Sequence, residues 1–307
     1  MIDWMVTKME KEPVMKIRGL TKKYGDVIGI KDLDLDVYPG EIMGFLGPNG
    51  AGKTTTIRAC LALLNKTAGD VKIFGLDSHK DSVEIRRDVG YLPGDFGMYP
   101  DMKAKAILKY LLSQSDVSDT TKMYELSEIL DLDLNKKYRE LSKGNRQKVG
   151  IVQAFMADQD LVILDEPTGG LDPLMQHKFY DLLRKESREG KTIFMSSHIL
   201  AEVEEVCDRV AIIRRGELQV VEEISSLQEK MGKKLEVEFR DGVDLDRFDM
   251  QGVEKVEVDG NRVSMIVTEN LDEVVKEVSK YDIMNMSLET FNLDQLFLTY
   301  YREDEGS

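Results

Sequence analysis

One stretch of this sequence constrains the fold more than any other, because it joins a short apolar run to an amphipathic helix through a glycine-rich loop. Residues 47–54 read GPNGAGKT and fit the pattern G-x-x-x-x-G-K-[ST]. Residues 41–46 before it predict a buried strand, and residues 55–64 after it have the apolar spacing of a helix. The alternative is an ordinary strand–helix turn. With both flanking elements present, the pattern predicts a phosphate-binding loop for a nucleoside triphosphate.

The chemistry of such a loop follows from its residue types. Glycines let successive backbone N–H groups turn toward an anion, and the N-terminus of the following helix adds partial positive charge. Lys53 can reach the β- and γ-phosphates of the nucleotide, and the Thr54 hydroxyl can bind Mg²⁺. ATP and Mg²⁺ are therefore the expected cofactors.

Length and charge narrow the class of protein further. The chain has 307 residues, which suggests two domains, and a formal net charge of −15. An acidic chain is not expected to wrap nucleic acid or anionic lipid by itself. Its two cysteines lie in apolar segments and predict buried, reduced thiols, and no apolar run approaches the length that spans a bilayer. We expect no secretory leader and no membrane insertion of its own.

A second group of polar residues follows apolar runs further along the chain. Residues 161–164 predict a buried parallel strand, which Asp165 and Glu166 follow at its carboxyl end, where catalytic groups of such sheets gather. Asp165 is expected to hold Mg²⁺ and Glu166 to polarise the attacking water, although paired acids at a strand end are often only solvated caps. An exposed helix is predicted at 178–189. His198 ends another predicted strand on the same side as Glu166, which favours a phosphate contact. Ser142 predicts the N-cap of a helix.

These patterns predict an α/β fold, a P-loop nucleotide-binding core with a mixed sheet, an antiparallel β subdomain and a helical subdomain. Two antiparallel strands precede the loop, and the turn predicted between them at 21–26 contains Tyr24, either as a turn aromatic or as a stacking face for adenine. Alternating residues with a hairpin turn at 259–261 predict a small α+β domain at the end of the chain. The expected organisation is a polar tail at 1–13, the nucleotide-binding domain at 14–221 with its helical subdomain at about 101–157, a linker at 222–234 and an accessory domain at 235–307.

The order and spacing of five motifs resemble an ATP-binding-cassette (ABC) ATPase over residues 14–220. They are the phosphate loop, the LSKGN segment at 141–145, LDEPT at 164–168, GLDP at 170–173 and Ser197-His198. The C-terminal helix predicted at 293–300 contains LDQLFL, which looks like the C-terminal extension of the drug- and antibiotic-exporting branch.

The resemblance implies roles that local patterns do not. Tyr24 corresponds to the adenine-stacking aromatic, and Asp172 belongs to the loop that crosses the dimer. His198 corresponds to the γ-phosphate sensor. A homodimer, or a heterodimer of cassettes, is implied to close head to tail around ATP. The nucleotide-binding set comprises Tyr24, Gly47, Pro48, Asn49, Gly50, Ala51, Gly52, Lys53, Thr54 and Thr55; the signature facing the opposite protomer's ATP comprises Leu141, Ser142, Lys143, Gly144 and Asn145; and the cross-dimer loop comprises Gly170, Leu171 and Asp172.

One position departs from the family pattern. The family has a Gln after the strand at 89–93, where it binds Mg²⁺ and senses the membrane partner, whereas this chain has Gly94 followed by Asp95. Either Asp95 or a water takes over the metal contact, or the ligand is missing and Thr54 with water suffices. Lys143, where the best-known signature has Gly, is a milder departure.

We therefore expect the ATP-hydrolysing subunit of a transporter with separate membrane-spanning subunits, engaged in export and peripheral at the cytoplasmic face of the membrane. Phe96, Met98 and Tyr99 are the expected apolar contacts with the permease. The rival interpretation is a soluble cassette ATPase acting on ribosomes or nucleic acid, which the acidic charge and single cassette disfavour. A regulator that binds ATP without turnover is disfavoured because Glu166 and His198 are both present.

Overall fold

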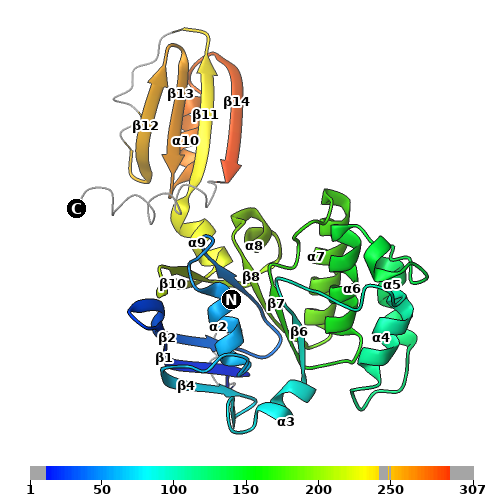
Figure 1. The fold of residues 1–307 in the computed structure, drawn as a ribbon. Coiled ribbons are helices and arrows are strands. Elements are labelled where there is room, and N and C mark those ends of the chain that lie inside the picture. The colour runs from blue at the N-terminus through cyan, green and yellow to red at the C-terminus, as the bar shows by residue number, and fades with distance from the viewer. Residues whose placement is uncertain (1–11, 242–247, 249, 291–307) are drawn as a thin grey trace. The chain divides into compact units, whose positions relative to one another are not determined.

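The computed structural model describes residues 12–241, 248 and 250–290, and its chain divides into two compact units, Met1–Val221 and Glu222–Ser307. Figure 1 shows the elements of each unit. In the first unit they are β1 (Met15–Tyr24), β2 (Val27–Val37), β3 (Ile42–Leu46), α2 (Lys53–Cys60), β4 (Ala68–Ile73), β5 (Leu76–Asp77), α3 (Ser82–Arg87), β6 (Val89–Leu92), α4 (Ala104–Leu112), α5 (Thr121–Ile129), η1 (Tyr138–Glu140), α6 (Lys143–Phe155), β7 (Leu161–Asp165), α7 (Pro173–Arg188), β8 (Thr192–Ser197), α8 (Leu200–Val206), β9 (Arg209–Arg214) and β10 (Glu217–Glu223).

A six-stranded sheet forms the centre of the first unit, in the order β10-β9-β3-β8-β7-β6. The pairings β9-β3, β3-β8, β8-β7 and β7-β6 are parallel. Every residue of β3, β7 and β8 is buried, which explains why these strands have apolar runs rather than alternation. Because the strands are parallel, the carboxyl ends of β3, β7 and β8 meet at one edge of the sheet.

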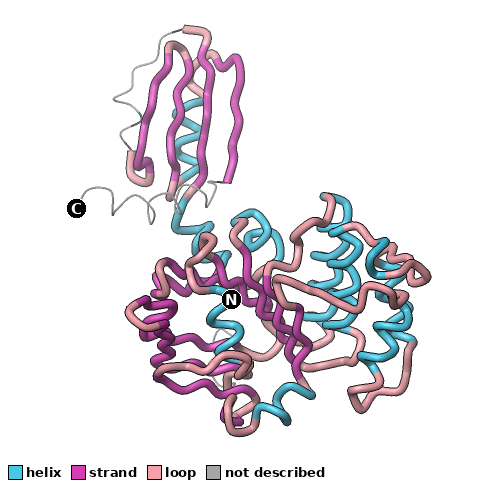
Figure 2. Tube along the Cα trace, in the orientation of Figure 1, coloured by secondary structure: helices cyan, strands magenta, loops and turns pink. Residues whose placement is uncertain are grey.

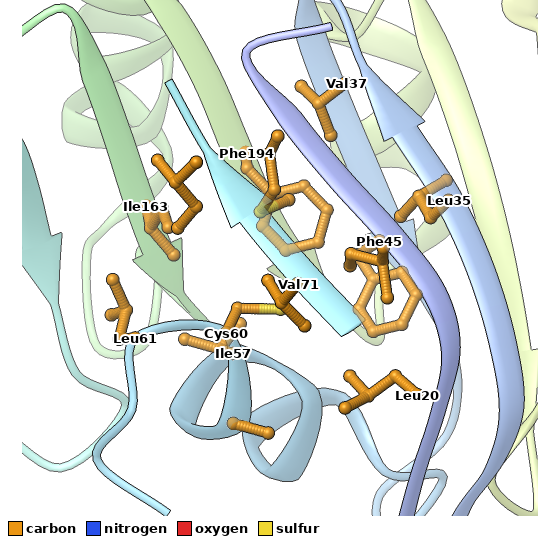
Figure 3. Packing of buried hydrophobic residues seen from close by; sticks show 14 of the residues in the cluster. Leu20, Leu35, Val37, Phe45, Ile57, Cys60, Leu61, Val71, Ile163 and Phe194 are labelled. Carbon is orange, nitrogen blue, oxygen red and sulfur yellow. The ribbon is translucent and has the colours of Figure 1, made fainter. Parts of the chain in front are cut away.

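An antiparallel sheet, β2-β1-β4-β5, packs against this centre. Figure 3 shows Leu20, Leu35 and Val71 of the antiparallel sheet meeting Phe45 of β3 and Phe194 of β8 in one apolar cluster. The two phenylalanine rings lie 5.4 Å apart between centroids. This shared core fixes the antiparallel strands beside the phosphate loop and confirms the two antiparallel strands predicted before it.

Three helices form the predicted helical subdomain. Figure 2 shows helices gathered at one end of the first unit and the antiparallel strands at the other. Helices α4 and α5 both pack on α6, which also packs on β6 and β7 of the central sheet. A buried carboxylate, Glu186 of α7, receives a 2.9 Å hydrogen bond from Nζ of Lys122 on α5. Ionic contacts therefore join the helical subdomain to the helix that follows β7.

The second unit contains α9 (Ile224–Met231), β11 (Lys233–Phe239), β12 (Val253–Asp259), β13 (Arg262–Val267), α10 (Leu271–Val278) and β14 (Ile283–Thr290). The strands form an antiparallel sheet in the order β12-β13-β11-β14. Its apolar core includes Phe239, Phe248 and Val274. The predicted hairpin at 259–261 joins β12 to β13. Strand β14 is not among the predicted elements, and the helix predicted at 293–300 lies outside the described residues.

Three predicted boundaries are wrong for local reasons. The turn predicted at 21–26 is strand up to Tyr24, because β1 and β2 stay paired to Tyr24 and Val27 and only Gly25 and Asp26 turn the chain. The helix predicted at 55–64 starts at Lys53 and ends at Cys60. The helix predicted from 178 starts at Pro173, since Asp172 caps it and proline is favoured in the first turn.

Two findings bear on the environment of the chain. Among residues 12–241, 248 and 250–290, no helix combines the length and the apolar character that crossing a bilayer requires. Cys60 and Cys207 are buried free thiols, as predicted, and burial raises the pKa of Cys60 to about 12. Neither thiol ionises near neutral pH, so both behave as small apolar side chains.

Candidate functional site

The phosphate loop lies between β3 and α2, where the sequence places it. Gly52 has a φ of 111°, and a Cβ at this position would lie 2.7 Å from the carbonyl oxygen of Gly29. A side chain at Gly47 would lie 2.3 Å from the carbonyl oxygen of Ile213. Only glycine fits these two positions, because the loop backbone packs directly against neighbouring backbone. This packing holds the loop at the N-terminus of α2, where an anion can bind.

Lys53 is nearly buried, with 6% of its side chain exposed. Its Nζ donates to the carbonyl oxygens of Gly47, at 2.6 Å, and Pro48, at 3.1 Å, and lies 3.1 Å from Oε1 of Glu166. A buried ammonium group needs such partners, because an unpaired buried charge is costly. Phosphate oxygens can take the place of these acceptors, so the loop can bind an anion.

Asp165 ends β7 and is fully buried. Its Oδ1 accepts a 2.7 Å hydrogen bond from Oγ of Ser196 on β8, whereas its Oδ2 is buried without a hydrogen-bond partner. An orphaned buried carboxylate oxygen is a ligand of the type that Mg²⁺ prefers, and Mg²⁺ sites use one or two carboxylates with water and phosphate oxygens. The described residues contain no cluster of three or more metal-ligating side chains. The orphaned Oδ2 of Asp165 therefore fits one ligand of a magnesium ion.

Glu166 has a backbone conformation that is uncommon for a residue with a side chain, with a φ of 51°. Its N–H donates a 3.0 Å hydrogen bond to Oγ of Ser196, which holds the strained turn in place. One carboxylate oxygen, Oε2, lies 2.6 Å from Nδ1 of His198. Strain of this kind concentrates at functional sites. The sequence-predicted residues Lys53, Glu166 and His198 are thus brought together at one edge of the sheet.

The signature segment and the cross-dimer loop also meet within the chain. The Ser142 hydroxyl caps α6 by accepting a 3.2 Å hydrogen bond from the N–H of Asn145. A Cβ at Gly144 would lie 2.4 Å from the carbonyl oxygen of Gly170. Asp172 caps α7. Within the part of the chain that the structure describes, no hydrogen bond or ion pair links residues 141–145 to the phosphate loop.

Tyr24 is 49% exposed, at the end of β1. Its ring edge would lie 3.1 Å from a Cβ at Gly29, the residue whose carbonyl oxygen approaches Gly52. Nζ of Lys22 lies 4.9 Å from the ring centroid. Tyr24 is therefore half-exposed beside Gly29, whose carbonyl oxygen approaches the phosphate loop, and the Lys22 ammonium group lies over its ring.

The position that departs from the family pattern lies against the carboxylate predicted to bind metal. A Cβ at Gly94 would lie 3.2 Å from Oδ2 of Asp165. Asp95 is exposed; burial raises the pKa of Tyr138, and the negative charge of Asp95 raises it further. Among the described residues, Asp95 makes no hydrogen bond with Asp165. A glycine at position 94 leaves room beside Oδ2 that a larger side chain would fill.

Sequence reasoning missed the polar residues that support the site. Ser196 bridges Asp165 and Glu166, and Nε2 of Gln147 donates a 2.8 Å hydrogen bond to the carbonyl oxygen of Pro167. Glu202 accepts from the hydroxyls of Thr168 and Ser197. The signal that could have found them is the cluster of hydroxyl residues at the ends of two buried strands.

The comparisons with known proteins agree with this architecture. A family model described as "ABC transporter" matches residues 30–169. The chain is 32% identical over 287 residues to an uncharacterized ABC transporter ATP-binding protein of Methanocaldococcus jannaschii, which covers 91% of this chain and 99% of that protein. It is 36% identical over 234 residues to the bacitracin transport ATP-binding protein BcrA of Bacillus licheniformis, covering 74% of this chain and 76% of the relative.

Solved structures give the same result. An ATP-binding subunit of an ABC transporter superposes with a TM-score of 0.65 at 28% identity, covering 70% of this chain and 92% of the other. A dimeric ABC transporter cassette has a TM-score of 0.63 at 24% identity, covering 68% and 98%, and supports the fold alone. Fold and site thus define a P-loop nucleotide-binding protein of the ABC type. The chain belongs to the family of ABC transporter ATP-binding proteins, as its motifs predict.

Proposed function

We propose that this chain hydrolyses ATP to drive a membrane transporter whose spanning subunits are separate polypeptides, and that the transport is export. The observation that carries the proposal is the position of the Glu166 carboxylate between Nζ of Lys53 and Nδ1 of His198. The relative in Bacillus licheniformis is a bacitracin transport protein, which supports the exporting branch.

The proposed chemistry uses the groups at the sheet edge. Lys53 releases its carbonyl acceptors and binds the β- and γ-phosphates, and Tyr24 stacks on the adenine ring. Glu166 accepts the proton of the attacking water, and His198 contacts the γ-phosphate. Thr54 and Asp165 would hold Mg²⁺, which neutralises phosphate charge when bound. Ser142, Gly144 and Asp172 act on the nucleotide of a second cassette, as the resemblance of their motifs to those of ABC ATPases implies.

A Glu166→Gln substitution tests the hydrolytic assignment. The amide keeps the size of the side chain but is not a base, so we expect turnover to fall by roughly 10²–10⁴ while nucleotide binding persists. Gel filtration with ATP should then show a trapped closed dimer. Glu189→Gln is the matched control, since Glu189 lies exposed at the end of α7. A Glu166→Gln protein that hydrolyses ATP near the wild-type rate would refute the assignment.

Partners are tested by purifying the tagged chain from its native membranes and identifying what accompanies it by mass spectrometry. We expect a stoichiometric membrane protein with several spanning helices, to which this chain binds at the cytoplasmic face. Ribosomal proteins or nucleic acid in its place would favour the rival function. Reconstitution of the pair in liposomes then gives the direction of transport.

We further propose that Asp95, directly or through water, replaces the missing glutamine in the magnesium site. The room beside Oδ2 of Asp165 at Gly94 supports this proposal. An Asp95→Ala substitution should raise the Mg²⁺ concentration needed for half-maximal ATPase activity, whereas Asp101→Ala, which removes an exposed carboxylate paired with Arg139, should not. An unchanged Mg²⁺ dependence in Asp95→Ala would mean that Thr54 with water suffices.

A further inference from the structure

One buried carboxylate, on the helix that follows His198, has no role in the chemistry proposed above. Glu202 lies on α8, which begins directly after His198 and Ile199, and only 4% of it is exposed. Its two oxygens accept hydrogen bonds from two hydroxyl groups, Thr168 Oγ1 at 2.6 Å and Ser197 Oγ at 2.7 Å. Thr168 and Ser197 are buried too.

The two hydroxyls belong to the two segments that carry the catalytic groups. Thr168 lies in the connection between β7 and α7, after Glu166 and before Asp172. Ser197 is the last residue of β8 and directly precedes His198. Glu202 is therefore hydrogen-bonded both to the segment that carries the proposed base, Glu166, and to the segment that carries the proposed γ-phosphate sensor, His198.

Energetics argue that this arrangement is not general core packing. Burying a carboxylate costs several kcal/mol unless its oxygens are satisfied, and apolar residues of similar volume usually serve the stability of a core at least as well. Both Glu202 oxygens are satisfied by O–H donors. The Ser197 oxygen also accepts a 2.9 Å hydrogen bond from the N–H of Ile199, which fixes the backbone directly after His198. The Glu202 carboxylate is the nearer acceptor of the Ser197 hydroxyl, whose Oγ also lies 3.3 Å from the carbonyl oxygen of Ile199.

We propose that Glu202 is a positioning residue for hydrolysis. Through Thr168 and Ser197 it holds the side chains of Glu166 and His198 at a fixed distance from each other. The proposal rests on the ATPase function proposed above. Glu202 touches no reacting atom in this arrangement; it acts on the 2.6 Å contact between Glu166 and His198. A displacement of about 1 Å at such a contact can cost on the order of 10² in rate.

The test uses isosteric changes of Thr168. In Thr168→Val the hydroxyl is lost with little change of volume, and we expect kcat to fall by about 10- to 100-fold with the KM for ATP changed less than about twofold. Thr168→Ser restores the hydroxyl and should recover most of kcat. The matched control is Thr192→Val, at the opposite end of β8, where a buried threonine accepts a 3.1 Å hydrogen bond from the N–H of Gly40; its kcat should stay at the wild-type value.

Coupling to His198 separates positioning from stability. If Thr168 acts through the Glu166–His198 contact, the effects of Thr168→Val and His198→Ala on kcat are not additive, because either change alone already disrupts that contact. Additive effects, or a Thr168→Val protein with full kcat and only a lower melting temperature, would overturn the proposal. Should Thr168→Val not fold, Ser197→Ala replaces it in the same cycle with the same two outcomes. A wild-type protein without ATPase activity would refute the proposed function instead.

Discussion

Nζ of Lys53 lies 3.1 Å from Oε1 of Glu166, so the proposed phosphate-binding cation and the proposed base share one contact. The Glu166 carboxylate therefore occupies the position beside the Lys53 ammonium group where a γ-phosphate would bind. Binding of ATP must separate the two side chains or bring a third charge between them. The same contact orders Glu166 while its backbone keeps the uncommon φ of 51°.

Competition for Lys53 predicts an effect of Glu166→Gln on binding as well as on turnover. Removal of the negative charge leaves the Lys53 ammonium group free to bind phosphate, and it also removes the repulsion between the Glu166 carboxylate and the phosphates. The pair is mostly buried, with 6% of Lys53 and 26% of Glu166 exposed, so desolvation offsets much of the attraction. A net worth of about 1 kcal/mol corresponds to about fivefold in affinity. We expect ATP to bind Glu166→Gln up to about fivefold more tightly, as measured by fluorescence titration with a labelled ATP. Weaker binding would show that Glu166 supports the nucleotide rather than competes with it.

Gly144→Ala sets helix propensity against packing. Alanine is favoured over glycine in a helix by roughly 0.8–1 kcal/mol, so propensity alone predicts a stabler protein. The new methyl group would lie 2.4 Å from the carbonyl oxygen of Gly170, however, and overpacking costs typically about 1–3 kcal/mol. Packing wins because the obstacle is backbone. We expect a lower melting temperature, by about 2–4 °C for each kcal/mol lost.

Gly97→Ala is the control for this substitution, because no atom lies within 4 Å of a Cβ there. Its melting temperature in differential scanning fluorimetry should equal that of the wild type. A Gly144→Ala protein as stable as the wild type would mean that the signature segment and the cross-dimer loop separate readily.

The central strands and the site's main residues could be predicted from sequence because their signals are local. A buried parallel strand needs an apolar run, and its carboxyl end exposes whatever follows, as at Asp165 and His198. The bridging role of Ser196 depends instead on register, since Ser196 is the residue of β8 that pairs with Asp165 of β7. No local pattern of a single strand contains that pairing, so the support of the site was not predicted.

Strand β14 was missed for a different reason. Met284, Met286 and Leu288 alternate with polar residues, which is the period of a strand, but none of the three is a β-branched or aromatic residue, the types that strands favour. These residues also stay 44–61% exposed, although Met286 and Leu288 pair with the buried Val237 and Leu235 of β11. An edge strand needs less apolar burial than a central one, and its sequence is accordingly less distinctive.

The pKa of Asp158 provides a prediction with a defined pH range. Hydrogen bonds from Lys191 and Lys122 lower it from its ordinary 3.8 to about 2. Because the folded pKa lies below the unfolded one, this group stabilises the fold above about pH 4 and loses its contribution as the pH falls toward 2. The side chain is 70% exposed, so solvent screening limits the contribution to about 1 kcal/mol or less.

Asp158→Asn should therefore unfold at lower urea concentration than the wild type at pH 7, and the difference should shrink as the pH is lowered from 4 toward 3. Asp181→Asn removes a carboxylate from an exposed pair within α7, with Arg184 at 3.3 Å, and should change the urea midpoint less at pH 7. A difference between Asp158→Asn and wild type that stays constant with pH would show that the two lysines do not act on this carboxylate.

Separate apolar cores predict that the cassette survives loss of the second sheet. The cluster around Phe45 and Phe194 draws on residues up to Val221, and the cluster around Phe239 draws on residues 235–281. Ending the chain at Gly232 removes the second cluster as a whole, so no half-emptied core is left behind. We expect the shortened protein to unfold cooperatively and to bind ATP within about threefold of the full chain, since a single core sustains two-state behaviour. Calorimetry and nucleotide titration of both proteins check this expectation. Loss of ATP binding in the shortened protein would show that the residues beyond Gly232 support the nucleotide site, whereas unchanged binding with altered turnover would assign them to regulation of hydrolysis.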